Sequence, residues 1–445
     1  MTTGTRAAIL FSILGAAIAG GACSRSRGST RVQLRIEPLA LAAAAPSLAP
    51  QLTVTRDQAI VSWLETQGRT AFLKFSERTA SGWSEPRTVA SGDDWFVNSA
   101  DVPSVIRLDD GALAAHWLQN AEGGEEAYDL RLAFSKDGGK TWTAPVSPHH
   151  DGTKTEHGFA SLFQAPGAGL GLVWLDGRAV VKENDNMSLR AAVFDHEGAQ
   201  LSESLLDDRV CDCCPTAIAI TSDGPIVAFR DRSPGEVRDI AISRLVAGQW
   251  TAPKTVHDDG WQIAACPVNG PALSANGRRV AVAWMTGKDD QGRAFAAFSD
   301  DAGATFGSPI RLDDGSSLGR VDVELIDDGS AVASWAEFAE QRAQLRIRWI
   351  DSRGTRGPAQ TVAGLGSERT SGYPRMARSG RELLLAWGVA GVFGPFLGGR
   401  VDVATGGYRW AFYAAALLSA AAFGVLSLAR DPRAAPAAVL AETGR

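Results

Sequence analysis

The segment Leu170-Gly-Leu-Val-Trp174 is a short apolar strand that ends in a tryptophan, and the same pattern recurs along the chain. The other copies end at Trp63, Trp117, Phe229, Trp284, Trp335 and Trp387. Successive aromatic positions are separated by 54, 57, 55, 55, 51 and 52 residues. Such a regular period indicates repeated supersecondary units. By the usual length rule, a chain of 445 residues would form about three domains. The repeat instead allows most of the chain to form a single architecture.

The aromatic strands lie in a recurring order of turns and strands. A turn such as Asp109-Asp110-Gly111 or Ser222-Asp223-Gly224 precedes each of most copies, and its glycine supplies the positive φ that a tight hairpin needs. A third strand such as Leu130–Phe134 follows, and a fourth comes after a proline, as in Ala144-Pro145-Val146. Four short antiparallel strands repeated in this way are typical of the blades of an all-β propeller.

The number of aromatic strands predicts seven blades over residues 50–388, with six blades and a separate hairpin as the alternative. The last copy stops after Trp387, so its outer strands are missing from the pattern. Arg31–Glu37 alternates polar and apolar residues ahead of the first copy. We expect this segment to pair with the last blade and to close the ring, because closure leaves only short edges exposed.

The composition is that of a globular protein, with 45% hydrophobic residues, 21% charged residues and a net charge of -6. These values exclude a largely disordered chain. The acidic balance also argues against nucleic acid as a partner, which would require a clustered basic surface. Six histidines and five cysteines leave little room for a large metal cluster, and we expect neither a cofactor nor a metal.

The N-terminus, residues 1–23, has the features of an export signal. Arg6 precedes an apolar run from Ala7 to Ala19, and three small residues precede Cys23. We expect a signal helix here and a protein at the periplasmic or cell-surface face of a bacterial membrane. The cysteine resembles a bacterial lipoprotein cleavage site, which implies lipidation of Cys23; a plain signal peptide is the alternative. Residues 24–49 would then form a linker and the closing strand.

The C-terminus contains an uncharged stretch from Trp410 to Ala429. Twenty residues at 1.5 Å each span a hydrocarbon core of about 30 Å. The preceding text Gly391-Val-Phe-Gly-Pro-Phe-Leu-Gly-Gly399, with Gly407-Tyr408, resembles the closing helices of a major facilitator transporter. We therefore expect residues 389–445 to be a membrane tail, a transmembrane helix or helix pair that anchors but cannot transport. A buried soluble helix and a chimeric gene are the alternatives.

An eight-residue motif lies between the third and fourth strands of two repeats. The copies read Ser135-Lys-Asp137-Gly-Gly139-Lys-Thr141-Trp142 and Ser299-Asp-Asp301-Ala-Gly303-Ala-Thr305-Phe306. The motif resembles the Asp-box of bacterial neuraminidase repeats, and the whole propeller resembles the sialidase-like superfamily. We expect the aspartate to accept backbone N–H bonds across the hairpin, the glycine to permit a left-handed turn, and the aromatic residue to pack between blades. The motif is therefore structural.

The resemblance implies a site with three arginines that hold a carboxylate, a Tyr–Glu nucleophile pair and an aspartic acid that acts as the acid. The closest match to the segment of one arginine is Ala100–Ser104, where Asp101 replaces the arginine and reverses the required charge. Tyr373 is the candidate nucleophile, and Asp101 or Asp212 the candidate acid. The candidate ligand-binding residues are Arg320, Arg375, Arg178, Arg230, His157 and Asn269. Most of these candidates fall at the starts of inner strands, where a propeller gathers its central pocket.

Two functions follow from this set, and the sequence leaves open whether the protein is an enzyme. The first is the binding of a glycan or glycoprotein ligand in the central pocket, at a membrane to which the apolar helix and Cys23 attach the protein. The second is hydrolysis of the exo-α-sialidase type, with a modified set of residues that bind the carboxylate of the substrate. A third interpretation gives the arginines and aspartates no ligand, and lets them pair with one another around a water-filled channel.

The cysteines form an unusual local sequence, Cys211-Asp212-Cys213-Cys214-Pro215, with Cys266-Pro267 further along. Cys211 lies 18 residues before Phe229, and Cys266 lies 18 residues before Trp284. An exported protein is expected to oxidise them. Four cysteines allow three pairings, and we predict Cys211–Cys266. The alternatives are free thiols or a Cu(I) or zinc site with Asp212 or His157 nearby.

Overall fold

The computed structural model describes residues 33–44, 47–121, 127–167, 169–180, 186–365, 372–388 and 397–404. Within these ranges the regular structure is β-strand, apart from a single 3-10 turn, η1 (Lys288–Asp290). A search of the same residues finds no helix with the length and apolar character needed to cross a membrane. The predicted signal segment, residues 1–23, and the apolar stretch 410–429 lie outside the described residues, so both remain predictions.

The described strands pair into seven sheets, of which six consist of consecutive strands. The first sheet contains β2 (Ser47–Thr55), β3 (Gln58–Gln67), β4 (Thr70–Thr79), β5 (Gly82–Trp83) and β6 (Arg87–Gly92). The second contains β7 (Ser104–Arg107), β8 (Leu113–Asn120) and β9 (Tyr128–Ser135). The third contains β10 (His157–Ala165), β11 (Gly169–Asp176), β12 (Met187–Phe194) and β13 (Gln200–Val210).

The next three sheets follow the same scheme. The fourth contains β14 (Ala217–Thr221), β15 (Gly224–Arg230), β16 (Ile240–Val246), β17 (Gln249–Trp250) and β18 (Lys254–Thr255). The fifth contains β19 (Ala272–Asn276), β20 (Arg279–Thr286), β21 (Arg293–Ser299) and β22 (Ile310–Arg311). The sixth contains β23 (Ser317–Leu325), β24 (Ala331–Ala339), β25 (Arg342–Ile350) and β26 (Gln360–Leu365).

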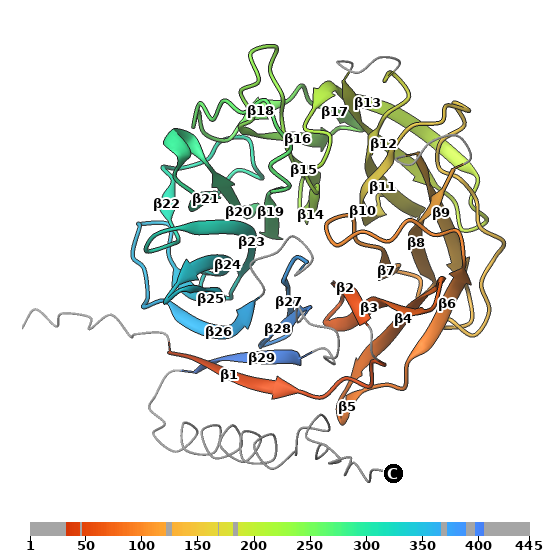
Figure 1. The fold of residues 1–445 in the computed structure, drawn as a ribbon, viewed down its shortest axis with the longest axis horizontal. Coiled ribbons are helices and arrows are strands. Elements are labelled where there is room, and N and C mark those ends of the chain that lie inside the picture. The colour runs from red at the N-terminus through yellow and green to blue at the C-terminus, as the bar shows by residue number, and fades with distance from the viewer. Residues whose placement is uncertain are drawn as a thin grey trace, which may run out of the picture. The chain divides into compact units, whose positions relative to one another are not determined.

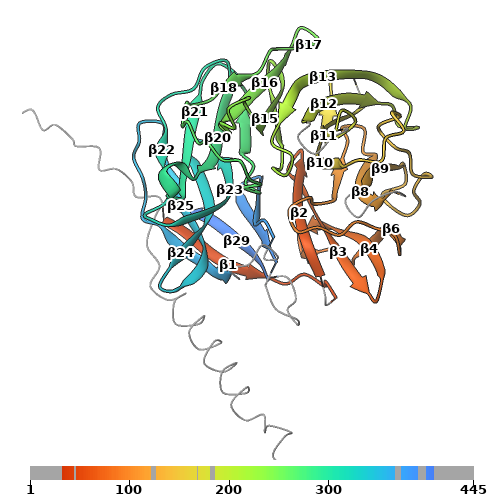
Figure 2. The ribbon, with the colours of Figure 1, turned by 45° about the horizontal axis from the view of Figure 1, so that its top comes forward.

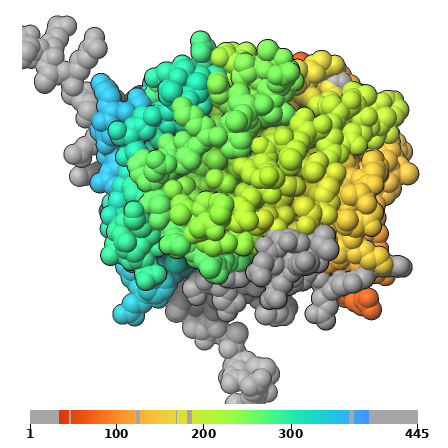
Figure 3. All heavy atoms as spheres, turned by 90° about the horizontal axis from the view of Figure 1, so that it is seen from above, coloured from red at the N-terminus to blue at the C-terminus, as the bar shows by residue number. Residues whose placement is uncertain are grey.

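The sheets are arranged as the blades of a propeller. The inner strand of each sheet contacts the inner strand of the next, in the order β2, β7, β10, β14, β19, β23 and β27 (Arg375–Ser379), and β27 contacts β2 again. These strands surround the centre in Figure 1, and the other strands of each sheet extend outward. In Figure 3 the third to fifth blades form a continuous wall at the side of the ring. The predicted all-β propeller is therefore confirmed.

The seventh aromatic strand, β28 (Glu382–Trp387), lies in a sheet of different construction. Its strand order is β1-β29-β28-β27, and β1 (Gln33–Leu39) pairs antiparallel with β29 (Leu397–Ala404), side by side in Figures 1 and 2. Six sheets are therefore blades built of consecutive strands, whereas the seven aromatic strands predict seven such blades. The last sheet differs because the N-terminal strand closes the ring, and it covers a sheet edge that would otherwise be exposed. The expected closing segment thus joins the last sheet.

This composite sheet also changes the boundary of the predicted membrane tail. The sequence assigned residues 389–445 to that tail, yet Leu397–Ala404 pairs with β28 from Glu382–Asp402 to Trp387–Leu397. This part of the range belongs to the propeller. The remainder of the predicted tail lies beyond the residues that the structure describes.

The period of the aromatic residues has a direct cause in the packing. Each of them packs against the sheet that precedes its own: Trp63 lies with Leu384 of β28, Trp174 with Leu132 of β9, and Trp335 with Ala283 of β20. Trp63, Trp174 and Trp335 are completely buried. One large side chain per interface is needed wherever two blades meet, so the spacing of the aromatic residues equals the length of a blade.

The indole N–H groups at these interfaces have carboxylate partners two residues further along the strand. Trp63 Nε1 donates to Glu65 Oε1 at 2.9 Å, and Trp335 Nε1 donates to Glu337 Oε2 at 2.8 Å. In the same way, Trp174 Nε1 donates to Asp176 Oδ2 at 2.8 Å. Buried polar groups are stable only with such partners. At these three interfaces, carboxylates therefore accept the indole N–H groups.

The Asp-box turns have the predicted structure. Asp137 Oδ1 accepts the backbone N–H of Thr141 at 2.9 Å, Oδ2 accepts its hydroxyl at 2.7 Å, and Gly139 has a φ of 82°. The bond from the Thr141 N–H is the main cause of the lowered pKa of Asp137, about 2. Trp142 packs edge-on against Phe75 of the preceding blade, with ring centroids 6.1 Å apart. The second copy repeats these bonds from Thr305 to Asp301.

Candidate functional site

The centre of the propeller contains a cavity of about 720 Å³. Its walls come from all seven inner strands, β2, β7, β10, β14, β19, β23 and β27. It extends along these strands to the turns that follow them, where Asp57, Asp109, Asn276 and Asp327 line it. A volume of several hundred cubic ångströms is typical of small-molecule sites. The sequence predicted a central pocket but not its extension toward the far ends of the strands.

The most polar part of the wall is made by β23, β27 and β19. Asp322 and Glu324 alternate along β23, so both face the cavity, and Arg375 of β27 lines it beside them. Asp322 accepts the backbone N–H groups of Val323 at 2.8 Å and Met376 at 2.7 Å. Ser274 Oγ of β19 donates to Glu324 Oε2 at 2.7 Å. Sequence reasoning missed Glu324, although the alternation from Arg320 to Glu324 was the available signal.

The electrostatics of this wall are set by desolvation. Burial, together with the neighbouring Asp322 charge, raises the pKa of Glu324 to about 8. Burial also raises the pKa of Asp322 to about 6, while the Arg375 charge lowers it. Near pH 7, Glu324 is therefore a neutral acid with an O–H donor, and the Asp322 carboxylate faces a guanidinium. The Nε atom of Arg375 is buried and has no hydrogen-bond partner among the described residues.

Hydroxyl groups line other parts of the cavity. Ser161 Oγ and Thr216 Oγ1 lie 2.8 Å apart on neighbouring inner strands, and Thr53 Oγ1 donates to the Val105 carbonyl oxygen at 2.6 Å. All three residues line the cavity. Thr216 Oγ1 donates to the Phe159 carbonyl oxygen at 2.9 Å and Ser274 Oγ donates to Glu324, so these hydroxyls offer acceptor lone pairs to a ligand, without adding charge.

Tyr373, the predicted nucleophile, immediately precedes β27 and is only 4% exposed. It packs with Ala100, Phe159 and the partly buried Val268. Its hydroxyl donates a hydrogen bond to the Val268 carbonyl oxygen, and burial raises its pKa to about 12. Arg375 lies over its ring, with the guanidinium carbon 5.4 Å from the ring centroid. The hydroxyl is thus bound to a carbonyl group rather than to the carboxylate that a Tyr–Glu pair requires.

The arginines predicted to bind a ligand differ in their hydrogen-bond partners. Arg320, Arg375 and Arg230 all act electrostatically on Tyr373, so the structure brings these four residues together. Arg230, however, donates to three backbone carbonyl oxygens, those of Asn269 at 2.7 Å, Arg238 at 2.6 Å and Met285 at 2.7 Å. Each of its three guanidinium nitrogens therefore has a backbone partner.

Asn269, another predicted ligand-binding residue, has backbone partners. Its Oδ1 accepts the backbone N–H of Arg320 at 2.9 Å, and its Nδ2 donates to the Pro267 carbonyl oxygen at 3.2 Å. Arg320 has a φ of 52°, a conformation that non-glycine residues adopt rarely. The described contacts of Asn269 therefore hold the irregular part of β23 around Arg320, where the register shifts between Gly319 and Asp322.

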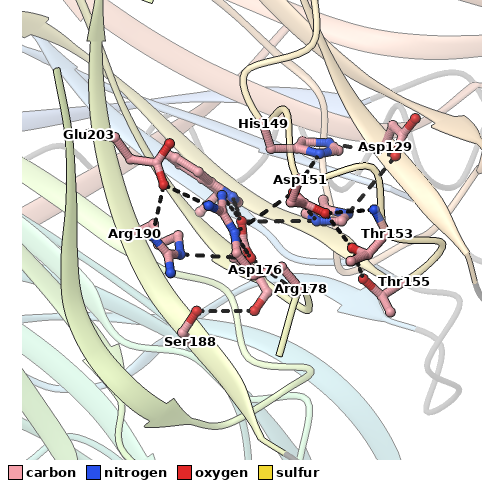
Figure 4. Close-up of polar contacts among 12 residues, drawn as sticks. Asp129, His149, Asp151, Thr153, Thr155, Asp176, Arg178, Ser188, Arg190 and Glu203 are labelled. Carbon is pink, nitrogen blue, oxygen red and sulfur yellow. Dashed lines mark hydrogen bonds and ion pairs between the residues drawn. The ribbon is translucent and has the colours of Figure 1, made fainter. Parts of the chain in front are cut away.

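The other predicted site residues have partners of their own. Asp101 is 1% exposed, its Oδ2 accepts the Tyr128 hydroxyl at 3.3 Å, and burial raises its pKa to about 7. Asp212 pairs with Arg238 at 3.1 Å. Arg178 pairs with Asp176 at 2.7 Å (Figure 4), and His157 is stacked on His149. Of the predicted site residues, Arg375 is the one that lines the central cavity.

The cysteines form two disulfides, Cys211–Cys214 and Cys213–Cys266. The predicted Cys211–Cys266 pair is therefore wrong. The turn after β13 places the Cα atoms of Cys211 and Cys214 5.7 Å apart, and it leaves Cys213 facing Cys266 with a Cα separation of 6.0 Å. A disulfide between neighbouring blades is present, as expected, but through Cys213.

Comparisons with known proteins bear on the fold alone. No protein-family model matches the chain, and no curated protein matches it. The chain is similar in structure to the polysaccharide lyase Uly1, with 11% identity over 85% of this chain and 95% of that one and a TM-score of 0.49. It is also similar to a K499G mutant of the NanB sialidase from Streptococcus pneumoniae, with 9% identity over 83% and 94% and a TM-score of 0.42. The β-propeller domain of the Trilobed protease from Pyrococcus furiosus has 12% identity over 77% and 92%, with a TM-score of 0.41.

Proposed function

We propose that this propeller binds a glycan through uncharged hydroxyl groups in its central cavity. The observation that carries the proposal is the composition of the wall, in which Ser161, Thr216 and Ser274 line the same cavity as the protonated Glu324. Sugar hydroxyls both donate and accept hydrogen bonds, so they match a wall in which hydroxyl oxygens accept and the Glu324 O–H donates. The volume of about 720 Å³ accommodates a small oligosaccharide.

The charges in the cavity favour a neutral ligand over an anionic one. The Arg375 guanidinium faces the Asp322 carboxylate, and at the end of the cavity Arg56 pairs with Asp109 and Arg378 pairs with Asp327. The charges around the cavity therefore nearly cancel, and they leave no excess of positive charge to attract a carboxylate ligand. This reasoning separates the proposal from the recognition of sialic acid.

A glycan array with neutral and sialylated members, probed with the purified full chain, tests the proposal. We expect neutral glycans to bind, and calorimetry on a positive glycan to give roughly tenfold weaker binding for Glu324→Ala, as expected for the loss of one good hydrogen bond. Glu324→Gln should retain most of the affinity, because its amide keeps a donor. Arg353→Ala, at a side chain that is 87% exposed, serves as the matched control. An array without positive glycans would overturn the proposal.

A second candidate function is hydrolysis of the exo-α-sialidase type. It is favoured by Arg320 and Arg375, whose charges act on Tyr373. It is opposed by the burial of Tyr373 and by the hydrogen bond from its hydroxyl to Val268. The test is the release of a fluorophore from a sialoside by the full chain. Release that is lost in Tyr373→Phe would establish this activity. Fluorescence that does not rise with the unmodified chain would exclude it.

We also propose that the protein is exported and attached to a membrane by the apolar C-terminal stretch and by a lipidated Cys23. The two disulfides support an oxidising compartment. Fractionation of bacteria that express the full chain, Cys23→Ala, a chain ending at Ala404 and the combination tests this. We expect release from the membrane only in the combination. Recovery of the full chain from the cytosol would contradict both parts.

A further inference from the structure

The two disulfides lie close together, at a place that the proposed function does not use. Cys211, Cys213 and Cys214 belong to the turn that follows β13, and Cys266 belongs to the segment that leads to β19. The Sγ atoms of Cys211 and Cys213, which belong to different disulfides, are 3.9 Å apart. The Sγ atoms of Cys211, Cys213 and Cys214 all lie within 4.8 Å of one another. The two disulfides are thus in near contact through their sulfur atoms.

The two disulfides differ in their access to solvent. Cys266 is exposed and Cys213 is half-buried, whereas Cys211 and Cys214 are each 1% exposed. A thiol in solution can therefore reach the Cys213–Cys266 disulfide at Cys266, but the Cys211–Cys214 disulfide is shielded from it. Access to the attacked sulfur is one of the factors that set the rate of thiol–disulfide exchange. The route from solvent to the buried disulfide therefore leads through Cys213.

A guanidinium group contacts the buried disulfide. Arg238 Nη1 lies 3.4 Å from Cys211 Sγ, and the Arg238 side chain is 3% exposed. Its Nη1 also donates to Asp212 at 3.1 Å and its Nη2 to Glu236 at 2.9 Å. Both carboxylates pair with Arg232 as well, so two arginines balance two carboxylates. A neighbouring arginine stabilises negative charge on sulfur. Arg238 therefore favours the approach of a thiolate to Cys211.

We propose that these four cysteines form a thiol–disulfide exchange site that oxidises an external dithiol. In the first step, a thiolate of the dithiol attacks Cys266 Sγ, a mixed disulfide forms, and the Cys213 thiolate leaves. In the second step, the Cys213 thiolate attacks Cys211 Sγ, the Cys211–Cys213 bond forms, and the Cys214 thiolate leaves. In the third step, the second thiolate of the dithiol attacks the dithiol's own sulfur in the mixed disulfide, which closes a cyclic disulfide and releases the Cys266 thiolate.

The three steps balance in atoms and electrons. The dithiol loses two electrons and two protons, and the protons pass through water to the thiolates of Cys214 and Cys266. One of the two protein disulfides is reduced, and the other remains, now between Cys211 and Cys213. The Cα atoms of residues two apart are separated by at most roughly 7 Å, and disulfides join Cα atoms up to about 6.8 Å apart. The new pair can therefore form without a large movement of the chain.

The second step distinguishes this site from an ordinary exposed disulfide. Reduction without exchange would free Cys213 and Cys266 and leave the Cys211–Cys214 disulfide intact. Exchange instead frees Cys214 and Cys266, and it creates a disulfide that the oxidised chain does not contain. The identity of the free thiols thus reports whether the near contact between Cys211 and Cys213 is used.

Partial reduction of the purified full chain tests the proposal. Cys23 is replaced by alanine, so that the fifth cysteine of the chain cannot exchange. The chain is treated with one equivalent of dithiothreitol, blocked with N-ethylmaleimide and mapped by mass spectrometry without reduction. We expect modified Cys214 and Cys266, a Cys211–Cys213 disulfide and one oxidised dithiothreitol per chain. Modified Cys213 and Cys266 with Cys211–Cys214 retained would overturn the proposal, and so would a chain that dithiothreitol does not reduce.

A double variant tests the route to the buried disulfide. Cys213→Ser with Cys266→Ser removes the exposed disulfide and leaves the Cys211–Cys214 pair. We expect dithiothreitol to leave this pair oxidised as long as circular dichroism shows a folded chain. Rapid reduction of the pair in the folded double variant would contradict the route through Cys213.

The contribution of Arg238 is tested by the rate of the second step. Arg238→Gln should slow the modification of Cys214 by roughly tenfold, as expected for the loss of one interaction with a charged group. Arg232→Gln, which removes the other guanidinium that pairs with the same two carboxylates, is the matched control and should react at the unmodified rate. An unchanged rate in folded Arg238→Gln would remove Arg238 from the site. The thiol map of the chain with both arginines decides the proposal even if this variant does not fold.

Discussion

The blade interfaces and the central cavity both enclose charged side chains, but they treat them differently. At the interfaces two charged groups have partners within the fold: Glu337 accepts the Trp335 indole N–H, and Arg230 donates to three carbonyl oxygens. In the cavity Arg375 Nε has no partner among the described residues, and Glu324 is protonated near neutral pH. A saturated charge contributes to stability, whereas a charge with unused donors can interact with a ligand.

The largest effect on the interface side is expected for Arg230→Ala. The substitution leaves three buried carbonyl oxygens without donors and removes the guanidinium that lies over Trp261. We expect the free energy of unfolding to fall by about 3–5 kcal/mol, as when a partner of a buried charged group is removed. Urea denaturation measures this, with Arg353→Ala as the exposed control. Equal stability of the two variants would show that Arg230 is not saturated in the way described.

A smaller effect is expected for Trp335→Phe. Phenylalanine keeps much of the apolar surface at the interface but removes the indole N–H, so Glu337 Oε2 keeps the Asp314 backbone N–H and loses its shorter hydrogen bond. We expect a loss of about 1–3 kcal/mol, the cost of one lost hydrogen bond to a charged group. Thermal and urea unfolding both report it. The double variant Trp335→Phe with Glu337→Gln should recover part of the loss; if it does not, the hydrogen bond is not the cause.

On the cavity side, Glu324 should make stability depend on pH. Its pKa is about 8 in the folded protein, above the ordinary value of about 4.3 in an unfolded chain. The stability contributed by the protonated form is then complete below about pH 4.3 and lost as the pH rises to 8. The slope from this group is at most about 1.4 kcal/mol per pH unit. Urea midpoints between pH 5 and 8 should therefore fall, and Glu324→Gln should flatten the curve. An unchanged slope in that variant would place the titration elsewhere.

Much of the fold could be predicted because its signals are local. The Asp137 turn depends on residues within six positions of each other, and the structure reproduces the predicted bonds. The number of repeats could likewise be predicted from the spacing of the aromatic residues, because every blade interface needs one large side chain. The closing strand was predictable from alternation in Arg31–Glu37, but its actual partner, β29, was not, because glycines and an apolar context favoured a membrane segment there.

The candidate site was less predictable, because it depends on which polar atoms already have hydrogen-bond partners within the fold. Arg230 and Arg375 both fall near inner strands, yet one is saturated by backbone carbonyls and the other is not. The disulfide pairing also depended on the direction of the turn after β13, which places Cys213 and not Cys211 opposite Cys266.

The sequence by itself determined a ring of small sheets, through the spacing of its tryptophans and the chemistry of its turns. Both depend on contacts that each repeat makes with itself or with the next repeat, so they leave a period in the chain. Only the tertiary structure decided which charges are satisfied, which are left facing the cavity, and that His149 stacks on His157. These outcomes depend on distances between residues far apart in the chain and on the loss of water around them, and neither leaves a pattern in the order of the residues.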